Sequence, residues 1–290
     1  MKEGSRAVDS RGRICHTADV HLFQPPWTDN LSPFLVRWLL FGHTVGIRWY
    51  GLNYVFSFFL VYLYFRGAAR RGRVPRLDLA AVDALTYAIA IGIVGGGRLG
   101  FVVQHLDTLR TDPLFPFRLT EGGMTFFGGL LGVLLAIFWA GRRYGMGFLA
   151  LTDIATFPAA LGLALGRITN FVNGELAGRP THGDWGVIFP SVDNVPRHPS
   201  QLYESASHFL LFGALVAANR TDWARARTGR LSYLFLTLYG FLRFATDFFR
   251  ADDTYWGPFS TGQWASLVVA LAGVIGLALL SSPQRAARRA

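Results

Sequence analysis

The sequence is poor in charge, in lysine and in cysteine. Only 16% of its 290 residues are charged, against about 25% in soluble domains, and 51% are hydrophobic, which argues against a water-soluble enzyme. Lys2 is the only lysine, so a retinal-type protein with a Schiff-base lysine in its last helix is excluded. The single cysteine, Cys15, excludes an internal disulfide framework and a cysteine-rich metal site, and we assign it no role.

Motifs of several enzyme classes are also missing. The chain has no HExxH metalloprotease motif, no GxSxG nucleophile elbow and no GxxxxGK(S/T) phosphate loop. Its seven histidines are scattered without metal-ligand spacing, so we expect neither a metal nor another cofactor. The first 30 residues contain no apolar run of seven or more, so the sequence predicts no cleavable secretory signal.

Long hydrophobic runs dominate the rest of the chain. A membrane-spanning helix needs about 20 mainly apolar residues, and seven runs qualify if one or two internal charges are accepted in four of them. The expected spans are Trp49–Phe65, Ala80–Val103, Met124–Gly141, Phe148–Phe171, Pro199–Ala218, Leu231–Phe249 and Thr261–Ser282. We predict an all-α, multi-pass membrane protein: a bundle of about seven transmembrane helices in a single domain, residues 31–290, after a loose polar tail, residues 1–30.

Arginine is concentrated in the segments that follow the odd-numbered spans. Five arginines lie between 66 and 76, two follow the third span, four lie between 220 and 230, and three follow the seventh span. All these segments fall on one side of the membrane, and the positive-inside rule places that side in the cytoplasm. The N-terminus is therefore expected outside and the C-terminus inside, and the net charge of +10 requires no nucleic-acid partner.

Glycines recur at a spacing of four in the second and third spans. They are Gly92, Gly96 and Gly100, followed by Gly128 and Gly132. This small-xxx-small pattern predicts close packing of the two helices. Arg98, which lies among these glycines, is interpreted as structural.

Polar residues inside the spans mark the candidate site, because an ionised group at mid-bilayer costs at least about 2.5–3.5 kcal/mol. They recur at helical spacing in the sets Tyr50/Asn53/Tyr54/Ser57, Gln201/Glu204/Ser205/His208 and Tyr239/Arg243/Asp247. For the first two sets, hydrogen bonding that holds the bundle together is an equally good interpretation. The third set has an arginine deep in a span, which favours a site.

The densest polar segment is Gly166–Arg179, at the outer end of the fourth span. Arg167 and Asn170 share a helix face, and an Asn-Gly pair then breaks the helix, exposing backbone donors at membrane depth. Arg167 and Arg243 together could form a fork for a phosphate, which on the outer leaflet belongs to a phospholipid. The alternative is a structural ion pair between Arg167 and Glu175.

These motifs resemble those of the prolipoprotein diacylglyceryl transferase family of bacteria. The resemblance extends from about Arg48 to the last span. The segments that carry it are Arg48–Leu52, Gly96–Gly100, Gly122–Leu130, Gly166–Arg179, Pro196–Glu204 and Tyr239–Arg243. It implies a seven-span bundle in the bacterial inner membrane with its N-terminus outside.

The resemblance also implies a reaction. A diacylglyceryl group passes from phosphatidylglycerol to the lipobox cysteine thiol of a preprolipoprotein, which forms a thioether and releases glycerol phosphate. The expected partners are therefore phosphatidylglycerol, preprolipoprotein signal peptides with a lipobox cysteine, and membrane lipids. No nucleic acid and no cofactor are expected.

That chemistry suggests roles for the polar residues. Cationic donors stabilise charge on a departing phosphate, for which Arg167 and Arg243 are the candidates. The catalytic candidates are Arg167, Arg243, Tyr239, Glu175 and His198, and the substrate-binding candidates are Tyr50, Asn170, Gly178 and Arg167. Phenol and amide groups of the second set would orient headgroup or glyceryl oxygens.

One position departs from the family pattern. Well-known members have histidine where Phe127 stands, and that histidine is proposed as the base that takes the thiol proton. Phenylalanine cannot accept a proton, so either His198, Glu175 or Tyr239 serves instead, or the proton acceptor of the family is not essential in this branch. The alternative function is a non-catalytic or weakly active member that binds phospholipid or signal peptides. A transporter is disfavoured, because the sequence lacks similarly broken helices in two halves.

Overall fold

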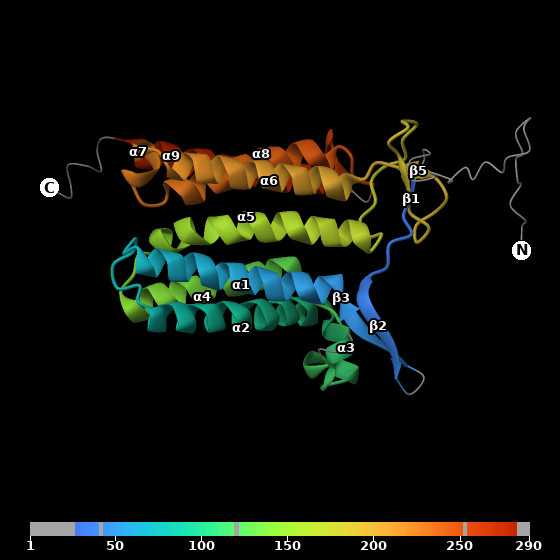
Figure 1. The fold of residues 1–290 in the computed structure, drawn as a ribbon, viewed down its shortest axis with the longest axis horizontal. Coiled ribbons are helices and arrows are strands. Elements are labelled where there is room, and N and C mark those ends of the chain that lie inside the picture. Colours follow the sequence, from blue (N-terminus) through green and yellow to red (C-terminus); the bar gives the residue numbers. More distant parts are fainter. Residues whose placement is uncertain (1–26, 41–42, 119–121, 252–253, 283–290) are drawn as a thin grey trace, which may run out of the picture.

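Long helices lie side by side along one axis in the computed structural model, which describes residues 27–40, 43–118, 122–251 and 254–282 (Figure 1). Seven helices of 18 to 26 residues lie within these ranges. They are α1 (Trp49–Arg70), α2 (Leu79–Gln104), α4 (Phe126–Tyr144), α5 (Phe148–Val172), α6 (Ser200–Asn219), α8 (Arg230–Asp247) and α9 (Thr261–Ser281). The short elements between them are α3 (Leu106–Thr111), the 3-10 turn η2 (Phe115–Phe117) and α7 (Asp222–Arg225).

Each expected span corresponds to one long helix, with its ends shifted by a few residues. The largest shift is in α1, which continues past Phe65 to Arg70, because Phe65 and Ala68 are buried against the rest of the bundle. Four helices, α2, α4, α5 and α9, are long and apolar enough to cross a membrane. The polar sets noted in the sequence lie in the other three, α1, α6 and α8, and lower their mean hydropathy.

Helix α5 lies in the middle of the bundle, with α1 on one side and α6 on the other (Figure 1). The pair α2 and α4 packs on the α1 side, and the pair α8 and α9 packs on the α6 side. The contact between α2 and α4 is made by glycines. A Cβ atom on Gly92 would lie 2.5 Å from the carbonyl oxygen of Gly132, and Gly96 meets Gly128 in the same way. The predicted close packing is confirmed.

The outer surface of the bundle is apolar. Ile91, Leu210 and Val268, on three different helices, are 73%, 68% and 66% exposed. Large aliphatic side chains rarely cover so much of a water-soluble monomer. Such a surface is suited to lipid, which agrees with the apolar lengths of the helices.

Two of the charges predicted to lie inside spans are engaged by backbone. The guanidinium of Arg98 donates to the carbonyl oxygens of Pro116 (2.9 Å), Gly122 (2.6 Å) and Gly123 (3.0 Å), and also to those of Phe115 and Arg118. These bonds tie α2 to the connection that leads into α4. The structural interpretation of Arg98 is confirmed.

Asp153 has the corresponding role at the other end of the bundle. Its carboxylate accepts hydrogen bonds from the backbone nitrogens of Gly229 (2.6 Å) and Ser232 (2.7 Å) and from the Ser232 hydroxyl (2.6 Å). These donors lie at the start of α8, where backbone nitrogens lack helical partners. Asp153 therefore caps α8 and joins it to α5.

Short strands gather at the end of the bundle where the described chain begins (Figure 1). β1 (Trp27–Thr28) pairs with β4 (Val187–Ile188), which pairs with β5 (Pro196–Arg197). A hairpin of β2 (Phe34–Leu40) and β3 (His43–Arg48) leads into α1, and β6 (Tyr255–Trp256) and β7 (Phe259–Ser260) precede α9.

The expectation of an all-α chain is thus too simple, since the protein is mostly helical with short strands before α1 and in the loops between helices. Most of these strands have two residues, which is too few for a hydrophobic period to be seen, and the apolar strand β2 has only seven residues, too few for a membrane span. Residues 1–26 of the expected tail lie outside the described residues. The division into a tail and one helical domain stays a prediction.

Candidate active site

A buried carboxylate, Glu204, is the centre of an ion cluster in the first turns of α6. Only 1% of its side chain is exposed, and arginines from two other helices and one loop approach it. Arg167 of α5 places Nε 2.8 Å from Oε2, while Nη1 of Arg243 on α8 lies 3.5 Å from Oε1. Arg250, just after α8, places Nη1 3.1 Å from Oε1. The two arginines predicted as a fork therefore do converge, around a carboxylate that the fork hypothesis did not include.

Asp247 is the second carboxylate of this cluster. Its Oδ1 lies 2.6 Å from Nη1 of Arg243, one helical turn earlier, and 3.7 Å from Nε of Arg250. Its Oδ2 accepts a hydrogen bond of 2.5 Å from Ser260, which also caps α9 through Gln263. Asp247 thus fixes the Arg243 side chain and ties the cluster to the start of α9.

Both fork arginines keep donors that no described residue uses. Arg167 directs Nε to Glu204 and donates Nη1 to the Asn170 side-chain oxygen at 3.3 Å. Its Nη2 has no partner within the described ranges. Arg243 directs Nη1 to its carboxylates, and neither Nε nor Nη2 is hydrogen-bonded in the described part of the chain. Since a guanidinium carries five N–H donors, both can still bind an anion.

A second network joins the fork to the outer end of α1. The Asn170 amide nitrogen donates to the Tyr50 hydroxyl at 2.5 Å and to Glu175 Oε2 at 3.2 Å. The Asn170 side-chain oxygen receives Arg167, so the amide connects a phenol, a carboxylate and a guanidinium. The four residues come from α1, α5 and the loop after α5, as the sequence predicted for a single site.

The alternative ion pair between Arg167 and Glu175 is not formed in the described residues. Arg167 pairs with Glu204 instead, and Glu175 accepts hydrogen bonds from the side-chain amides of Asn170 and Asn173 and lies beside the Tyr50 hydroxyl. The chain turns away after α5 through Gly174, whose φ is +66°. This left-handed turn separates the Glu175 side chain from the arginine that precedes it on the helix.

Gly178 lies where three segments of chain meet. Its nitrogen donates to the carbonyl of His198 at 3.0 Å, and a Cβ atom there would lie 2.5 Å from the carbonyl oxygens of both His198 and Phe249. The next residue, Arg179, donates its Nε to the carbonyl of Arg250 at 2.7 Å. Gly178 therefore allows the loop after α5 to hold the end of α8, and substrate contact by Gly178 stays a prediction.

His198 lies in an aromatic cluster rather than in the ion cluster. Its Nδ1 is 3.3 Å from the Tyr203 hydroxyl, and its ring centroid is 5.1 Å from that of Phe249. Burial among these rings lowers the pKa of His198 below its ordinary 6.5. The imidazole is therefore neutral at pH 7 and able to accept a proton.

Tyr239 precedes Arg243 by one turn of α8. Its ring stacks on His208 of α6, with centroids 5.7 Å apart and planes 7° apart, and on Phe235 at 5.8 Å. No hydrogen bond to the Tyr239 hydroxyl is present within the described ranges. The stacked rings position the phenol beside the fork without occupying its polar end.

Phe127, at the start of α4, faces outward. It is 76% exposed, and its ring contacts only the neighbouring Phe126 ring, at 5.6 Å, among the ring pairs of the described chain. Helix α4 packs on α2 and α5, whereas the ion cluster is built from α5, α6 and α8. The position at which the family pattern has histidine thus presents an apolar side chain to the surface.

Three residues of the cluster were absent from the predicted site: Glu204, Asp247 and Arg250. Glu204 and Asp247 stood in the polar sets of their helices, so the helical spacing contained a signal for them. What the sequence lacked was any indication that α6 and α8 are neighbours at that level. Arg250 lies beyond the regular helix, where spacing gives no side-chain direction.

Comparison with known proteins identifies what the chain resembles. A family model described as prolipoprotein diacylglyceryl transferase matches residues 38–279. A protein of Geobacter sulfurreducens named phosphatidylglycerol–prolipoprotein diacylglyceryl transferase is 42% identical over 259 residues, covering 87% of this chain and 96% of the relative. Proteins of the same name from Nitrosospira multiformis and Azoarcus sp. are each 41% identical, covering 80% and 84% of this chain and 82% and 94% of their own lengths.

Proposed function

The chain belongs to the prolipoprotein diacylglyceryl transferase family, and we propose that it transfers the diacylglyceryl group of phosphatidylglycerol to the cysteine thiol of a preprolipoprotein. It is a transferase, as are the relatives named above, and none of those names supports the non-catalytic alternative. The observation that carries the proposal is the convergence of Arg167 and Arg243, both with unused donors, around a buried carboxylate.

The reaction is a displacement at the glyceryl carbon that bears the phosphate. The cysteine sulfur forms a bond to this carbon, the carbon–oxygen bond to the phosphate breaks, and glycerol phosphate leaves with the electron pair. A base removes the thiol proton, because a free cysteine with a pKa of about 8.5 is only a few per cent thiolate at neutral pH. The protein must therefore stabilise an anionic leaving group and accept one proton.

Arg167 and Arg243 supply the first requirement in this proposal. The unused nitrogens of the two guanidinium groups bind the phosphate, whose charge becomes concentrated as the bond breaks. Glu204 and Asp247 hold the arginines in place, so that little reorganisation is needed when the charge develops. Because the cluster is buried, these interactions are stronger than they would be in water.

Tyr50 and Asn170 orient the lipid, since their phenol and amide groups lie next to Arg167 and suit hydroxyl and ester oxygens. We assign the proton to Glu175. It has no ion-pair partner among the described residues, it is exposed, and it contacts Asn170 directly. Tyr239 and His198 remain the other candidate bases, while Gly178 holds the loop that follows Glu175.

The proposed topology has seven spans in the bacterial inner membrane, with the N-terminus outside and the C-terminus in the cytoplasm. The arginine-rich connections support it through the positive-inside rule. The ion cluster lies at the opposite end of the bundle from these connections, at the outer leaflet. The lipobox cysteine and the lipid headgroup would both reach it there.

The test is a reconstitution of the full chain in liposomes that contain phosphatidylglycerol, with a synthetic lipobox peptide. Mass spectrometry should detect a peptide heavier by one diacylglyceryl group, together with free glycerol phosphate. A peptide with serine in place of the lipobox cysteine is the matched control and should remain unmodified. Binding of lipid and peptide without any thioether product would overturn the proposal in favour of the non-catalytic alternative.

A further inference from the structure

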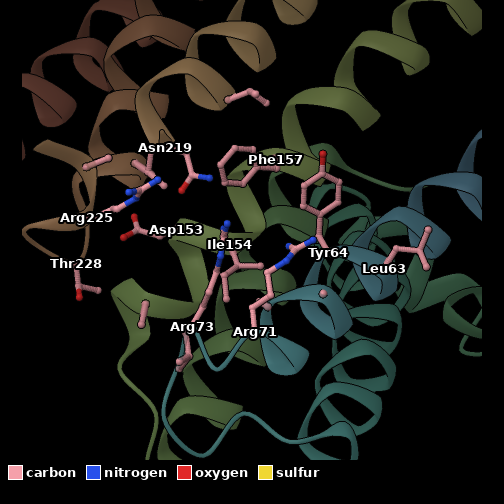
Figure 2. A pocket seen from close by; sticks show the side chains of 17 residues that line it. Leu63, Tyr64, Arg71, Arg73, Asp153, Ile154, Phe157, Asn219, Arg225 and Thr228 are labelled. Atoms are coloured by element: carbon pink, nitrogen blue, oxygen red, sulfur yellow. The ribbon is translucent and has the colours of Figure 1, made fainter. Parts of the chain in front are cut away.

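A pocket of about 720 Å³ opens at the end of the bundle opposite the ion cluster (Figure 2). It lies between the end of α1, the start of α5, the end of α6 and the segment from α7 to the start of α8. Asp153 of the pocket precedes Arg167 by 14 residues on α5, which corresponds to about 21 Å along the helix axis. Its volume falls within the range of small-molecule and cofactor sites, about 300–1,000 Å³.

Three arginines from two segments line this pocket: Arg71 and Arg73, just after α1, and Arg225 of α7 (Figure 2). Arg71 and Arg73 have no acidic partner in the described part of the chain. Within the described ranges Arg225 pairs only with Asp222, at 3.9 Å and with both side chains highly exposed, which is a weak interaction in water. The pocket therefore offers guanidinium groups that form no strong ion pair with the described residues.

The acid in the pocket does not cancel this charge. Both carboxylate oxygens of Asp153 accept short hydrogen bonds from the start of α8, so they are turned toward Gly229 and Ser232. The neutral residues Tyr64, Asn219 and Thr228, which carry hydroxyl and amide groups, also line this pocket.

The other wall is apolar. It is formed by Leu63, Ile154, Phe157, Val216 and Leu231, and the Phe157 ring stacks on Tyr64 at 5.7 Å. A positive rim at the end of the helices next to an apolar wall matches a molecule with an anionic head and a hydrocarbon chain. A purely topogenic role for the arginines requires neither the cavity nor this wall.

We propose that this pocket binds an anionic phospholipid of the cytoplasmic leaflet. The phosphate lies among Arg71, Arg73 and Arg225, and the first part of an acyl chain lies against the wall of Leu63 and Val216. Basic pockets between transmembrane helices at this level suit anionic head groups. The lipid bridges α1, α5, α6 and α8, and this site is separate from the proposed transfer site, relying only on the proposed orientation.

The test uses the full chain in liposomes with a phosphatidylglycerol that carries a photoreactive group near the start of one acyl chain. Peptide mapping should find label in residues 63–74, 150–157 and 216–231. Replacing Arg71, Arg73 and Arg225 with glutamine should weaken labelling of these segments about fivefold per arginine and on the order of 100-fold together. The position of the label separates this result from any lipid bound at the transfer site.

The matched control replaces Arg70, Arg142 and Arg143 with glutamine, which removes the same charge from the same side but from outside the pocket. Its labelling should equal that of the unaltered protein, and equal loss in both triple variants would overturn the proposal in favour of general surface charge.

A second variant, Val216→Trp, places a large side chain against the apolar wall and keeps the three arginines. It should also abolish labelling, and it tests the proposal even if the triple variant does not fold. Full labelling of a folded Val216→Trp variant would contradict the proposal. If inorganic phosphate competes with the labelled lipid, the pocket is a site for free phosphate, and the proposal of a bound phospholipid is overturned.

Discussion

Arg167 and Glu204 form an ion pair between the end of α5 and the start of α6, with Nε of the arginine 2.8 Å from Oε2 of the glutamate. The same carboxylate meets Arg243 and Arg250, so one buried negative charge organises three positive ones. Two consequences follow. Removal of the carboxylate should release Arg167 and weaken the hold on Arg243 and Arg250, which Asp247 also contacts, and removal of one arginine should leave the others in place.

Glu204→Gln should therefore damage stability as well as transfer. Breaking a buried ion pair on one side costs about 3–5 kcal/mol, because the remaining charges are left uncompensated. We expect a destabilisation of about 3 kcal/mol and loss of activity, measured by thermal unfolding in detergent and by the peptide transfer assay. Glu175→Gln is the matched control. Its carboxylate contacts side-chain amides and the Tyr50 hydroxyl and pairs with no arginine in the described residues, so the substitution should reduce transfer with little effect on unfolding. Equal destabilisation by both variants would contradict the central place of Glu204.

Arg243→Lys should keep a charge near Asp247 but lose the planar set of donors. Lysine cannot contact carboxylates and a phosphate at the same time through one fork. We expect the rate of transfer to fall about 100- to 1,000-fold, the usual effect of removing one donor to a developing anion, while Arg167→Ala and Arg243→Ala abolish transfer. The measurement is the single-turnover rate with phosphatidylglycerol and the lipobox peptide. Near-normal activity of either alanine variant, with the bundle intact by circular dichroism, would refute the phosphate assignment.

Much of the fold could be predicted from the sequence, because a membrane-spanning helix needs a long apolar run and such runs are visible. The convergence of Arg167 and Arg243 could be predicted for a related reason. A charge inside a membrane span is energetically costly, so such residues face the interior of the bundle and mark a candidate site. Arg98 was also separable from the fork. It lies among glycines that bring α2 and α4 together, and all the guanidinium nitrogens of Arg98 donate to backbone carbonyl oxygens.

The rest of the site could not be predicted, since it depends on which helices are neighbours. Glu204 and Arg243 are 39 positions apart, and nothing in the spacing of either helix says that they meet. The two-residue strands were missed because pairings such as Trp27 with Val187 are fixed by tertiary contacts. For the same reason an ion pair between Arg167 and Glu175 stood as the alternative to the phosphate fork, although the left-handed turn at Gly174 directs Glu175 away from Arg167.

Tyr50→Phe should test the network around Asn170. The substitution removes the hydroxyl that accepts the Asn170 amide at 2.5 Å, so the amide loses one of its fixed partners. A neutral hydrogen bond contributes about 0.5–1.5 kcal/mol, which predicts a roughly three- to tenfold loss in kcat/KM. Tyr54→Phe is the control, because Tyr54 is 50% exposed and has no hydrogen bond to Asn170. If the two variants behave alike, Tyr50 does not orient the lipid.

Phe127→His should produce no large gain in rate. The Phe127 side chain is 76% exposed on α4, so a histidine there would face the surface rather than the ion cluster. We expect the rate of the variant to stay within about threefold of the unaltered protein, measured across the neutral pH range. An increase of tenfold or more would show that the native site lacks its base, and it would remove Glu175 from that role.

His198 should make stability depend on pH in one direction. Burial lowers its pKa in the folded state, so below the ordinary value of about 6.5 the unfolded chain binds the proton more readily and folding is penalised as the pH falls. Above that value both states are neutral and the penalty disappears.

The His198→Gln variant lacks this penalty. Its unfolding temperature, relative to that of the unaltered protein, should therefore rise as the pH is lowered from about 7 to about 5. His182→Gln, which removes an exposed histidine of the same loop, is the matched control for the loss of an imidazole. A His198→Gln curve parallel to that of the unaltered protein would mean that the imidazole is not buried, and a simultaneous loss of transfer by 100-fold or more at pH 7 would make His198 rather than Glu175 the proton acceptor.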